Sequence, residues 1–183
     1  HGGQSTIFGY IPPENLNVNH NEPGHFNVTN LHTHGWHVNP TENHDNIFAA
    51  IGPGDPTYLQ QVDLPADHVA GTFWYHAHVH GSTAIQVASG MAGALIVVDP
   101  NKGLDAIPQI AEAKDFVFVM QQLAYDEQGQ IENYNNLQQR GYSNLNRPVF
   151  VNGQAYPVIE MMPNEVQRWR FIHAGITDGI QPM

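Results

Sequence analysis

The sequence predicts an all-β fold, a β-sandwich or barrel with one short helix. Three observations support this class. Short extended runs rich in β-branched and aromatic residues follow one another along the chain. Turn-forming segments such as GPGDP (52–56) and LPADHVAG (64–71) separate these runs, and a single stretch of the first half has the pattern of a helix.

The first half of the sequence contains four predicted strands and this helix. The helix is expected directly after the third strand, with Ser82 as its N-cap and Gly90 as its end. The strands are expected where β-branched and aromatic residues occur in alternating patterns, at 25–34, 57–64, 71–80 and 93–99, and the helix is expected at 82–90.

The second half begins with a more polar connection, residues 99–115, which is a predicted linker. Further strands are expected after it, at 116–125, 147–153, 156–162 and 165–174, with a polar loop at 133–147. The sequence therefore predicts two domains, one over residues 1–105 and a second over 106–183 that has too few strands to close.

The composition excludes several classes of function. The 183 residues include 6 Lys and Arg against 17 Asp and Glu, and the formal net charge of -11 repels the phosphates of nucleic acids. No apolar run approaches the roughly 20 residues of a membrane-spanning helix, so no membrane partner is expected. Cysteine is absent, so the sequence offers neither a disulfide nor a thiolate ligand for a metal.

Histidines are concentrated in two segments of the first half. The segment TNLHTHGWHVNPTENHD (29–45) contains four, and GTFWYHAHVHGS (71–82) contains three at alternate positions. Side chains two residues apart on a strand share a face, so His32 and His34 point the same way, as do the histidines of the second segment. If the two strands are neighbours, their H-x-H pairs face each other.

Converging imidazoles predict a metal site. A neutral imidazole offers one lone pair to a metal, and several imidazoles suit copper, zinc or iron, whereas calcium and magnesium prefer oxygen ligands. A lone strand histidine more often lies on a solvated face, but two H-x-H pairs favour metal. Two alternatives stay open: a three-histidine zinc site would indicate a hydratase or hydrolase, and a module that stores metal would catalyse nothing.

The sequence resembles the multicopper oxidases, a laccase-like family of tandem cupredoxin domains. The first two copper motifs of that family resemble NLHTHG (30–35) and GTFWYHAHVHGS (71–82), followed by SGMAGALIV (89–97). The opening of the family's second domain resembles RPVFVNGQAYPVIEMMPNEVQRWRFIHA (147–174). The resemblance implies a cupredoxin-like Greek-key β-sandwich or barrel, followed by an incomplete second cupredoxin-like domain.

The resemblance also implies roles for individual residues. In the family the first histidine of H-x-H-G binds the type 2 copper and the second binds a type 3 copper, which implies these roles for His32 and His34. Both histidines of the W-Y-H-x-H motif bind type 3 coppers, which implies His76 and His78. An acidic residue between the motifs assists proton delivery to reduced oxygen. Asp45 is the candidate for this catalytic role, with a plain turn aspartate as the alternative.

Two further histidines are weaker candidates for metal ligands. His80 is in phase with His76 and His78, and it is expected to orient them through a hydrogen bond more readily than to bind metal. His37 follows Gly35, which breaks the alternation of the strand, so the pattern supports its ligation less strongly.

The sequence departs from the family in its C-terminal motifs. The family's trinuclear copper cluster takes eight histidines, and four of them come from two C-terminal motifs, one of which includes the cysteine that binds the type 1 copper. Neither motif occurs here, so the chain is expected to hold no type 1 copper and at most half of the cluster. We therefore expect a copper-binding fragment of a longer oxidase that is inactive by itself.

For the intact enzyme, the resemblance implies one-electron oxidation of a reducing small molecule or metal ion, coupled to the reduction of dioxygen to water. The implied partners are dioxygen, this reducing substrate and the remaining cupredoxin domains, supplied by the same protein or by an oligomer. A secreted or periplasmic location is expected, with any export signal removed or upstream of His1.

Overall fold

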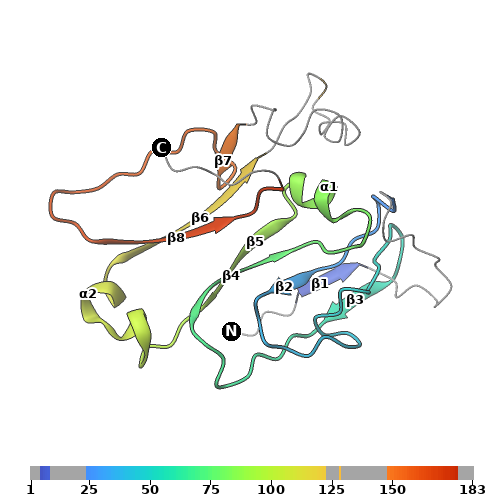
Figure 1. Cartoon of the computed structure of the whole chain (residues 1–183), viewed down its shortest axis with the longest axis horizontal. Helices are drawn as coiled ribbons and strands as arrows, with labels where there is room; N and C mark the ends of the chain where they lie inside the picture. The colour runs from blue at the N-terminus through green and yellow to red at the C-terminus, as the bar shows by residue number, and fades with distance from the viewer. Residues whose placement is uncertain (1–4, 9–23, 123–127, 129–147, 177–183) are drawn as a thin grey trace. The chain divides into compact units, whose positions relative to one another are not determined.

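The fold is mostly β-structure in the described part of the chain, which is residues 5–8, 24–122, 128 and 148–176 of a computed structural model (Figure 1). The elements run in the order β1 (Ser5–Phe8), β2 (His32–His34), β3 (Thr57–Gln60), β4 (Gly71–His76), α1 (Thr83–Ala88), β5 (Ala92–Val97), η1 (Gly103–Ala106), α2 (Pro108–Ala111), β6 (Lys114–Gln122), β7 (Val149–Val151) and β8 (Gln167–His173). The predicted all-β class is confirmed. None of the described helices is long and apolar enough to cross a membrane.

Within the described residues, three small sheets organise the strands. β1 pairs with β3 antiparallel, from Ser5 opposite Gln60 to Phe8 opposite Thr57. β4 lies between β2 and β5 in the second sheet, and β6 lies between β7 and β8 in the third. β6 runs antiparallel to β7 and parallel to β8. The second sheet bears on function because it makes neighbours of β2 and β4, the strands that carry the two histidine motifs.

The chain divides into two compact units, and the boundary between them falls inside β4. One unit comprises His1–His68 with Tyr75–Val87, and the other comprises Val69–Trp74 with Ala88–Met183. This division differs from the domain boundary at 105/106 that the sequence predicts, so that boundary stays a prediction. The histidines of both H-x-H motifs belong to the first unit.

The segment that leads into β2 is largely irregular, although the sequence predicts a strand over 25–34. Thr29 forms an isolated bridge with Ile51 in this segment. The carbonyl of Val28 accepts a hydrogen bond from the side chain of Gln86 in α1. Because side chains satisfy part of this backbone, the segment does not depend on a neighbouring strand for all of its hydrogen bonds.

Polar side chains share the interior of the first unit with a small hydrophobic cluster. That cluster consists of Ala49, Ile51 and Tyr58. Three amide side chains are buried to the same degree, each at 4% exposure: Asn30, Gln60 and Gln86. Buried amides are costly without hydrogen-bond partners, so their contacts constrain the segments around them.

β4 is shorter than the strand that the sequence predicts over 71–80, because it ends at His76. Beyond that point the backbone N–H of His78 donates to the side-chain oxygen of Asn30 at 2.7 Å. The predicted helix is confirmed as α1. Gly90 follows it with a φ of 94°, the left-handed conformation that glycine adopts readily at helix ends.

In the second unit, part of the predicted linker is structured. η1 and α2 lie within 99–115, and β6 begins two residues before its predicted start. The predicted strand at 156–162 is wrong: no described strand pairs with this stretch, and Tyr156 and Val158 are 93% and 86% exposed. Its alternating sequence has no sheet against which to bury an apolar face. The predicted polar loop at 133–147 lies outside the described residues.

Ion pairs join β8 to β6 and to η1 in the second unit. The side chain of Arg170 in β8 is 4% exposed, and its Nε donates to both carboxylate oxygens of Asp115 in β6, at 2.9 and 2.8 Å. Its Nη1 also donates to the hydroxyl of Thr72. Arg168 pairs with Asp105 of η1. A buried guanidinium is costly unless it is paired. Asp115 is the closer of the two carboxylates near Arg170, since Oδ2 of Asp115 lies 2.8 Å and Oδ1 of Asp105 lies 3.8 Å from its Nη2.

Removing the Asp115 carboxylate should destabilise the second unit. We expect Asp115→Ala to lower the free energy of unfolding by about 2 kcal/mol, because the buried charge of Arg170 loses its closest partner. Lys102→Ala is the matched control, because Nζ of Lys102 lies 3.6 Å from Oδ2 of Asp99 in an ion pair at the surface. Losing this pair should lower the free energy of unfolding by less than about 0.5 kcal/mol. Urea denaturation followed by circular dichroism measures both values, and equal stabilities of the two variants would contradict this role of Asp115.

Candidate metal centre

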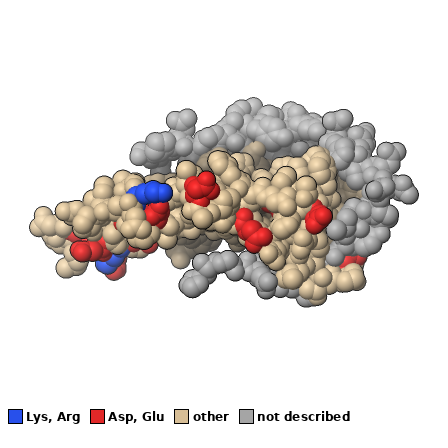
Figure 2. Space-filling view, turned by 90° about the horizontal axis from the view of Figure 1, so that it is seen from below, with Lys and Arg blue, Asp and Glu red and all other residues tan. Residues whose placement is uncertain are grey.

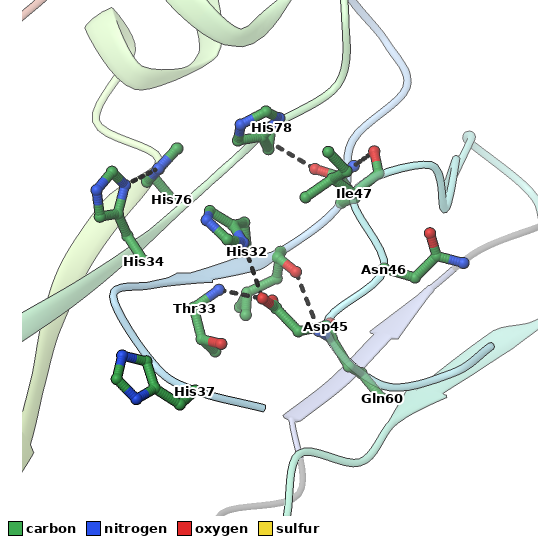
Figure 3. Close-up of polar contacts among 12 residues, drawn as sticks. His32, Thr33, His34, His37, Asp45, Asn46, Ile47, Gln60, His76 and His78 are labelled. Carbon is green, nitrogen blue, oxygen red and sulfur yellow. Dashed lines mark hydrogen bonds and ion pairs between the residues drawn. The ribbon is translucent and has the colours of Figure 1, made fainter. Parts of the chain in front are cut away.

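Three histidine side chains converge in the first unit. His32 and His34 belong to β2, and His76 is the last residue of β4 (Figure 3). One ligand nitrogen from each of these rings can be chosen so that all three lie within 4.8 Å of one another. Nδ1 of His34 is 3.1 Å from Nε2 of His76. Nitrogens this close can bind a common metal ion.

A fourth ring, that of His78, lies beside this cluster although the residue follows the end of β4. Its centroid is 5.0 Å from that of His32 and 5.5 Å from that of His76. Nδ1 of His78 is buried and has no hydrogen-bond partner among the described residues. A buried imidazole nitrogen without a partner is unusual, and beside three other imidazoles it fits a ligand of copper or zinc.

The hydrogen bonds of His76 leave one of its nitrogens for a metal. Its Nδ1 donates to the carbonyl of Ala77 at 2.8 Å, which assigns the proton of the neutral ring to that atom. Nε2 then carries the lone pair, and in this structure it accepts a hydrogen bond from Nδ1 of His34. The same lone pair is available to a metal ion.

Asp45 orients His32 within the cluster. Its Oδ2 accepts a hydrogen bond from Nδ1 of His32 at 2.9 Å, and its Oδ1 accepts one from the backbone N–H of Thr33 at 2.7 Å (Figure 3). The residue is only 6% exposed. Because Nδ1 of His32 faces the carboxylate, Nε2 is left to bind a metal, as in metal sites where a carboxylate holds a ligand histidine. Asp45 is therefore more than a turn residue.

The surroundings favour neutral imidazoles. Burial among the other groups lowers the pKa of His34, and the nearby His32 lowers it further. Burial also lowers the pKa of His76, more than its hydrogen bond to the Ala77 carbonyl raises it, and burial likewise lowers the pKa of His78. Neighbouring histidines add to the lowering in both cases. Neutral imidazole is the form that binds metal, so the cluster is prepared for a metal ion at neutral pH.

The carboxyl group of Asp45 is held in its charged form. Burial raises its pKa, but the hydrogen bonds from the His32 ring and from the backbone of Thr33 outweigh this, and the pKa lies below its ordinary value. A negative charge therefore faces His32 at neutral pH, where it strengthens the donor ability of Nδ1–H.

The two weaker histidine candidates lie outside the three converging rings. The ring centroid of His80 is 5.8 Å from that of His78 and 5.7 Å from that of Phe48. His37 donates its backbone N–H to Nε2 of His68 at 3.1 Å, and Figure 3 shows its ring apart from the other four histidines. The structure thus places His80 beside the cluster and His37 away from it, and any ligand role for them stays a prediction.

The sequence gives no signal for Asn30, whose carboxamide contacts the backbone of His78 across 48 residues of chain. A single asparagine in a predicted strand has no distinctive spacing, and its side chain bonds to main-chain atoms that any residue could supply. The contacts of Asn30 can be recognised only in the folded structure, where its partners lie close together.

Comparisons with known proteins find similarity to multicopper oxidases in sequence. A family model described as multicopper oxidase matches residues 12–102. A laccase from Trametes maxima is 34% identical over 89 residues, which cover 47% of this chain and 17% of the laccase. The cell division protein FtsP of Escherichia coli (strain K12) is 33% identical over 111 residues, which cover 61% of this chain and 23% of FtsP.

A solved structure supports the fold. The multicopper oxidase McoA from the hyperthermophile Aquifex aeolicus matches with a TM-score of 0.63 at 24% identity, over 82% of this chain and 32% of McoA. At this identity the likeness concerns the fold alone, and with the family model it confirms the predicted cupredoxin-like class. The chain spans less than a quarter of the curated relatives that it matches and about a third of McoA.

Replacing the Asp45 carboxylate should lower stability in a pH-dependent way. Its lowered folded-state pKa means that the ionised form stabilises the fold above the ordinary pKa of about 4, and that this contribution is lost as the pH falls through the lowered value. We expect Asp45→Asn to lower the free energy of unfolding by about 1–2 kcal/mol at neutral pH. The difference from the unmodified protein should shrink as the pH falls below about 4.

Urea denaturation of the metal-free protein measures this difference at each pH. Asp63→Asn is the control, because Asp63 is exposed and its carboxylate accepts from the side chain of the nearby, exposed Gln61. A stability loss for Asp45→Asn that stays constant from neutral to acidic pH would show that the carboxylate charge is not what stabilises this site.

Proposed function

Because the chain belongs to the multicopper oxidase family through its N-terminal domain, we propose that His32, His34, His76 and His78 bind copper as part of a trinuclear site. The convergence of three of these rings on one point carries the proposal. The finer assignment gives His32 to the type 2 copper and the other three histidines to the type 3 coppers.

The residues of this site hold and orient the metal. Copper bound there would supply the one-electron redox chemistry needed to reduce dioxygen. The imidazoles would contribute neutral lone pairs, and Asp45 keeps the proton of His32 on Nδ1 so that the lone pair of Nε2 is left for a metal. Each carboxylate oxygen of Asp45 already accepts a hydrogen bond. These contacts favour an orienting role for Asp45 over the proton delivery that the family resemblance implies.

The whole reaction belongs to a larger oxidase in this proposal. That enzyme would couple oxidation of a reducing small molecule or metal ion to reduction of dioxygen to water, with further cupredoxin domains supplying the other ligands. A thiolate-bound copper for electron entry must come from outside these 183 residues, which contain no cysteine. The secreted or periplasmic location is likewise a proposal.

Metal binding without turnover is the second candidate. The chain is 33% identical over 111 residues to FtsP, a protein whose name assigns it to cell division. Elemental analysis of the purified protein and oxygen-consumption assays of the complete enzyme separate the candidates. Copper with turnover supports the oxidase, copper without turnover supports the binding module, and a preference for zinc would favour the hydratase or hydrolase.

The copper-loaded chain should be weakly coloured and inactive by itself. Because the chain offers no thiolate, its Cu(II) should lack the intense blue charge-transfer band of a cysteine-bound copper. Oxidation of a phenolic dye should not exceed that produced by free copper. Visible spectroscopy and an oxygen electrode measure the two properties. An intense blue band, or sustained turnover that a chelator abolishes, would contradict the proposal that the chain binds copper through histidines alone and is inactive by itself.

Copper binding should also be linked to protons. Because the pKa values of His34, His76 and His78 are lowered, affinity should fall mainly below the ordinary imidazole pKa of about 6.5. We expect His78→Ala to weaken binding about tenfold or more and to flatten its pH dependence. His173→Ala, at an exposed position of β8, should change neither property.

Calorimetric titration of copper between about pH 5 and 7.5 tests this contrast across the range where imidazoles titrate. Equal affinities and equal pH profiles for His78→Ala and His173→Ala would mean that His78 is no ligand, and the proposed set would have to be reduced.

A further inference from the structure

A buried carboxamide joins two parts of the metal centre without belonging to the ligand set. Asn30 is 4% exposed and lies between the bridge at Thr29 and the start of β2. Its Oδ1 accepts the backbone N–H of His78 at 2.7 Å. Its Nδ2 donates to the carbonyls of Ile47 at 2.8 Å and Ala49 at 3.1 Å. Figure 3 labels His78 and Ile47, two of the residues whose backbone groups it joins.

The three backbone groups bonded by Asn30 lie outside the named strands. His78 follows the end of β4, and the two carbonyls belong to the irregular segment 45–49. Buried backbone groups need partners, and these three require one acceptor and two donors. An asparagine side chain supplies one acceptor oxygen and an amide group that donates two hydrogen bonds. The similarly sized aspartate has no donor when ionised, and leucine has neither donors nor an acceptor. The chemistry of the contact is therefore specific to the amide.

The Asn30 contacts link the segment that carries Asp45, the partner of His32, to the main chain of His78. The segment 45–49 begins with Asp45, which orients His32, and the other bond of Asn30 fixes the main chain of His78. The ring centroids of His32 and His78 are 5.0 Å apart. A small shift of the Asp45 segment relative to His78 would change this spacing, and metal coordination tolerates little such change.

We propose that Asn30 is a positioning residue of the metal centre. Its carboxamide holds the main chain of His78 against the segment that carries Asp45, so that the oriented ring of His32 and the ring of His78 face one metal site at a fixed spacing. This inference rests on the proposed function, since it requires that the histidines bind copper.

Gln86 offers a matched control for the loss of a buried amide. Like Asn30 it is 4% exposed. Its Nε2 donates to the carbonyls of Phe26 and Val28, and its Oε1 accepts a hydrogen bond from the hydroxyl of Thr29. Like Asn30, it donates two side-chain hydrogen bonds and accepts one within the same unit, although it accepts from a hydroxyl and not from a backbone N–H. None of these bonds is to a histidine or to the Asp45 segment.

The test compares Asn30→Ala with Gln86→Ala in the full 183-residue chain, with Cu(II) as the probe. Calorimetry gives the affinity, electron paramagnetic resonance gives the copper hyperfine splitting, and thermal melts give the stability of the metal-free proteins. We expect Asn30→Ala to weaken Cu(II) binding about 10- to 100-fold and to alter the hyperfine splitting. Gln86→Ala should lower the melting temperature but leave affinity and spectrum within about twofold of the unmodified chain.

Two outcomes would overturn the positioning role. One is an Asn30→Ala protein that is folded and binds Cu(II) with unchanged affinity and spectrum, and the other is an equal change in Gln86→Ala. Failure of the unmodified chain to bind Cu(II) would instead contradict the proposed function.

If Asn30→Ala does not fold, Asn30→Ser takes its place, and hydrogen exchange of the metal-free, unmodified chain adds a second test. A protected His78 amide supports the contact, and a rapidly exchanging one refutes it.

Discussion

The hydrogen bonds of the Asp45 carboxylate are the constraint on which the candidate metal centre depends. β2 is only three residues long, and its ladder does not determine the rotation of the imidazole ring of His32. The carboxylate supplies that constraint: one oxygen holds the backbone of Thr33 and the other holds the ring of His32. Because both oxygens belong to one planar group, the ring is fixed relative to the strand that carries it.

Crowding of the imidazoles then sets the charge of the site. A proton on any one ring would be partly desolvated and would lie close to its neighbours, which is why the pKa values of His34, His76 and His78 are lowered. The neutral lone pairs that result are available to a metal cation, and the negative charge of Asp45 also favours a cation at the site. The hydrogen bond between His34 and His76, worth about 1 kcal/mol, is a small obstacle by comparison.

The spacing of the histidines is enough to predict which rings of β2 and β4 meet, because the strands are neighbours and H-x-H places side chains on one face. The same reasoning does not explain His78, which lies beyond β4 and contacts Asn30 instead. Bonds from a side chain to distant backbone leave no local pattern in a sequence. The strand prediction for 156–162 is wrong for a related reason. Alternation of apolar and polar residues shows that a stretch can pair in a sheet, but not that a partner strand is present.

The four candidate ligands belong to one compact unit. Asn30 and Asp45, whose side chains hold the backbone of His78 and the ring of His32, belong to the same unit. In the proposed function, metal affinity would depend on contacts within that unit. Turnover would depend on an electron-entry ligand that this sequence does not contain. Binding and redox activity are separable in such an arrangement. In the proposed function, a substitution at Asn30 or Asp45 would act first on the positions of the candidate ligands. Any loss of oxidation in a complete enzyme would then follow from misplaced copper, because the source of electrons would be unchanged.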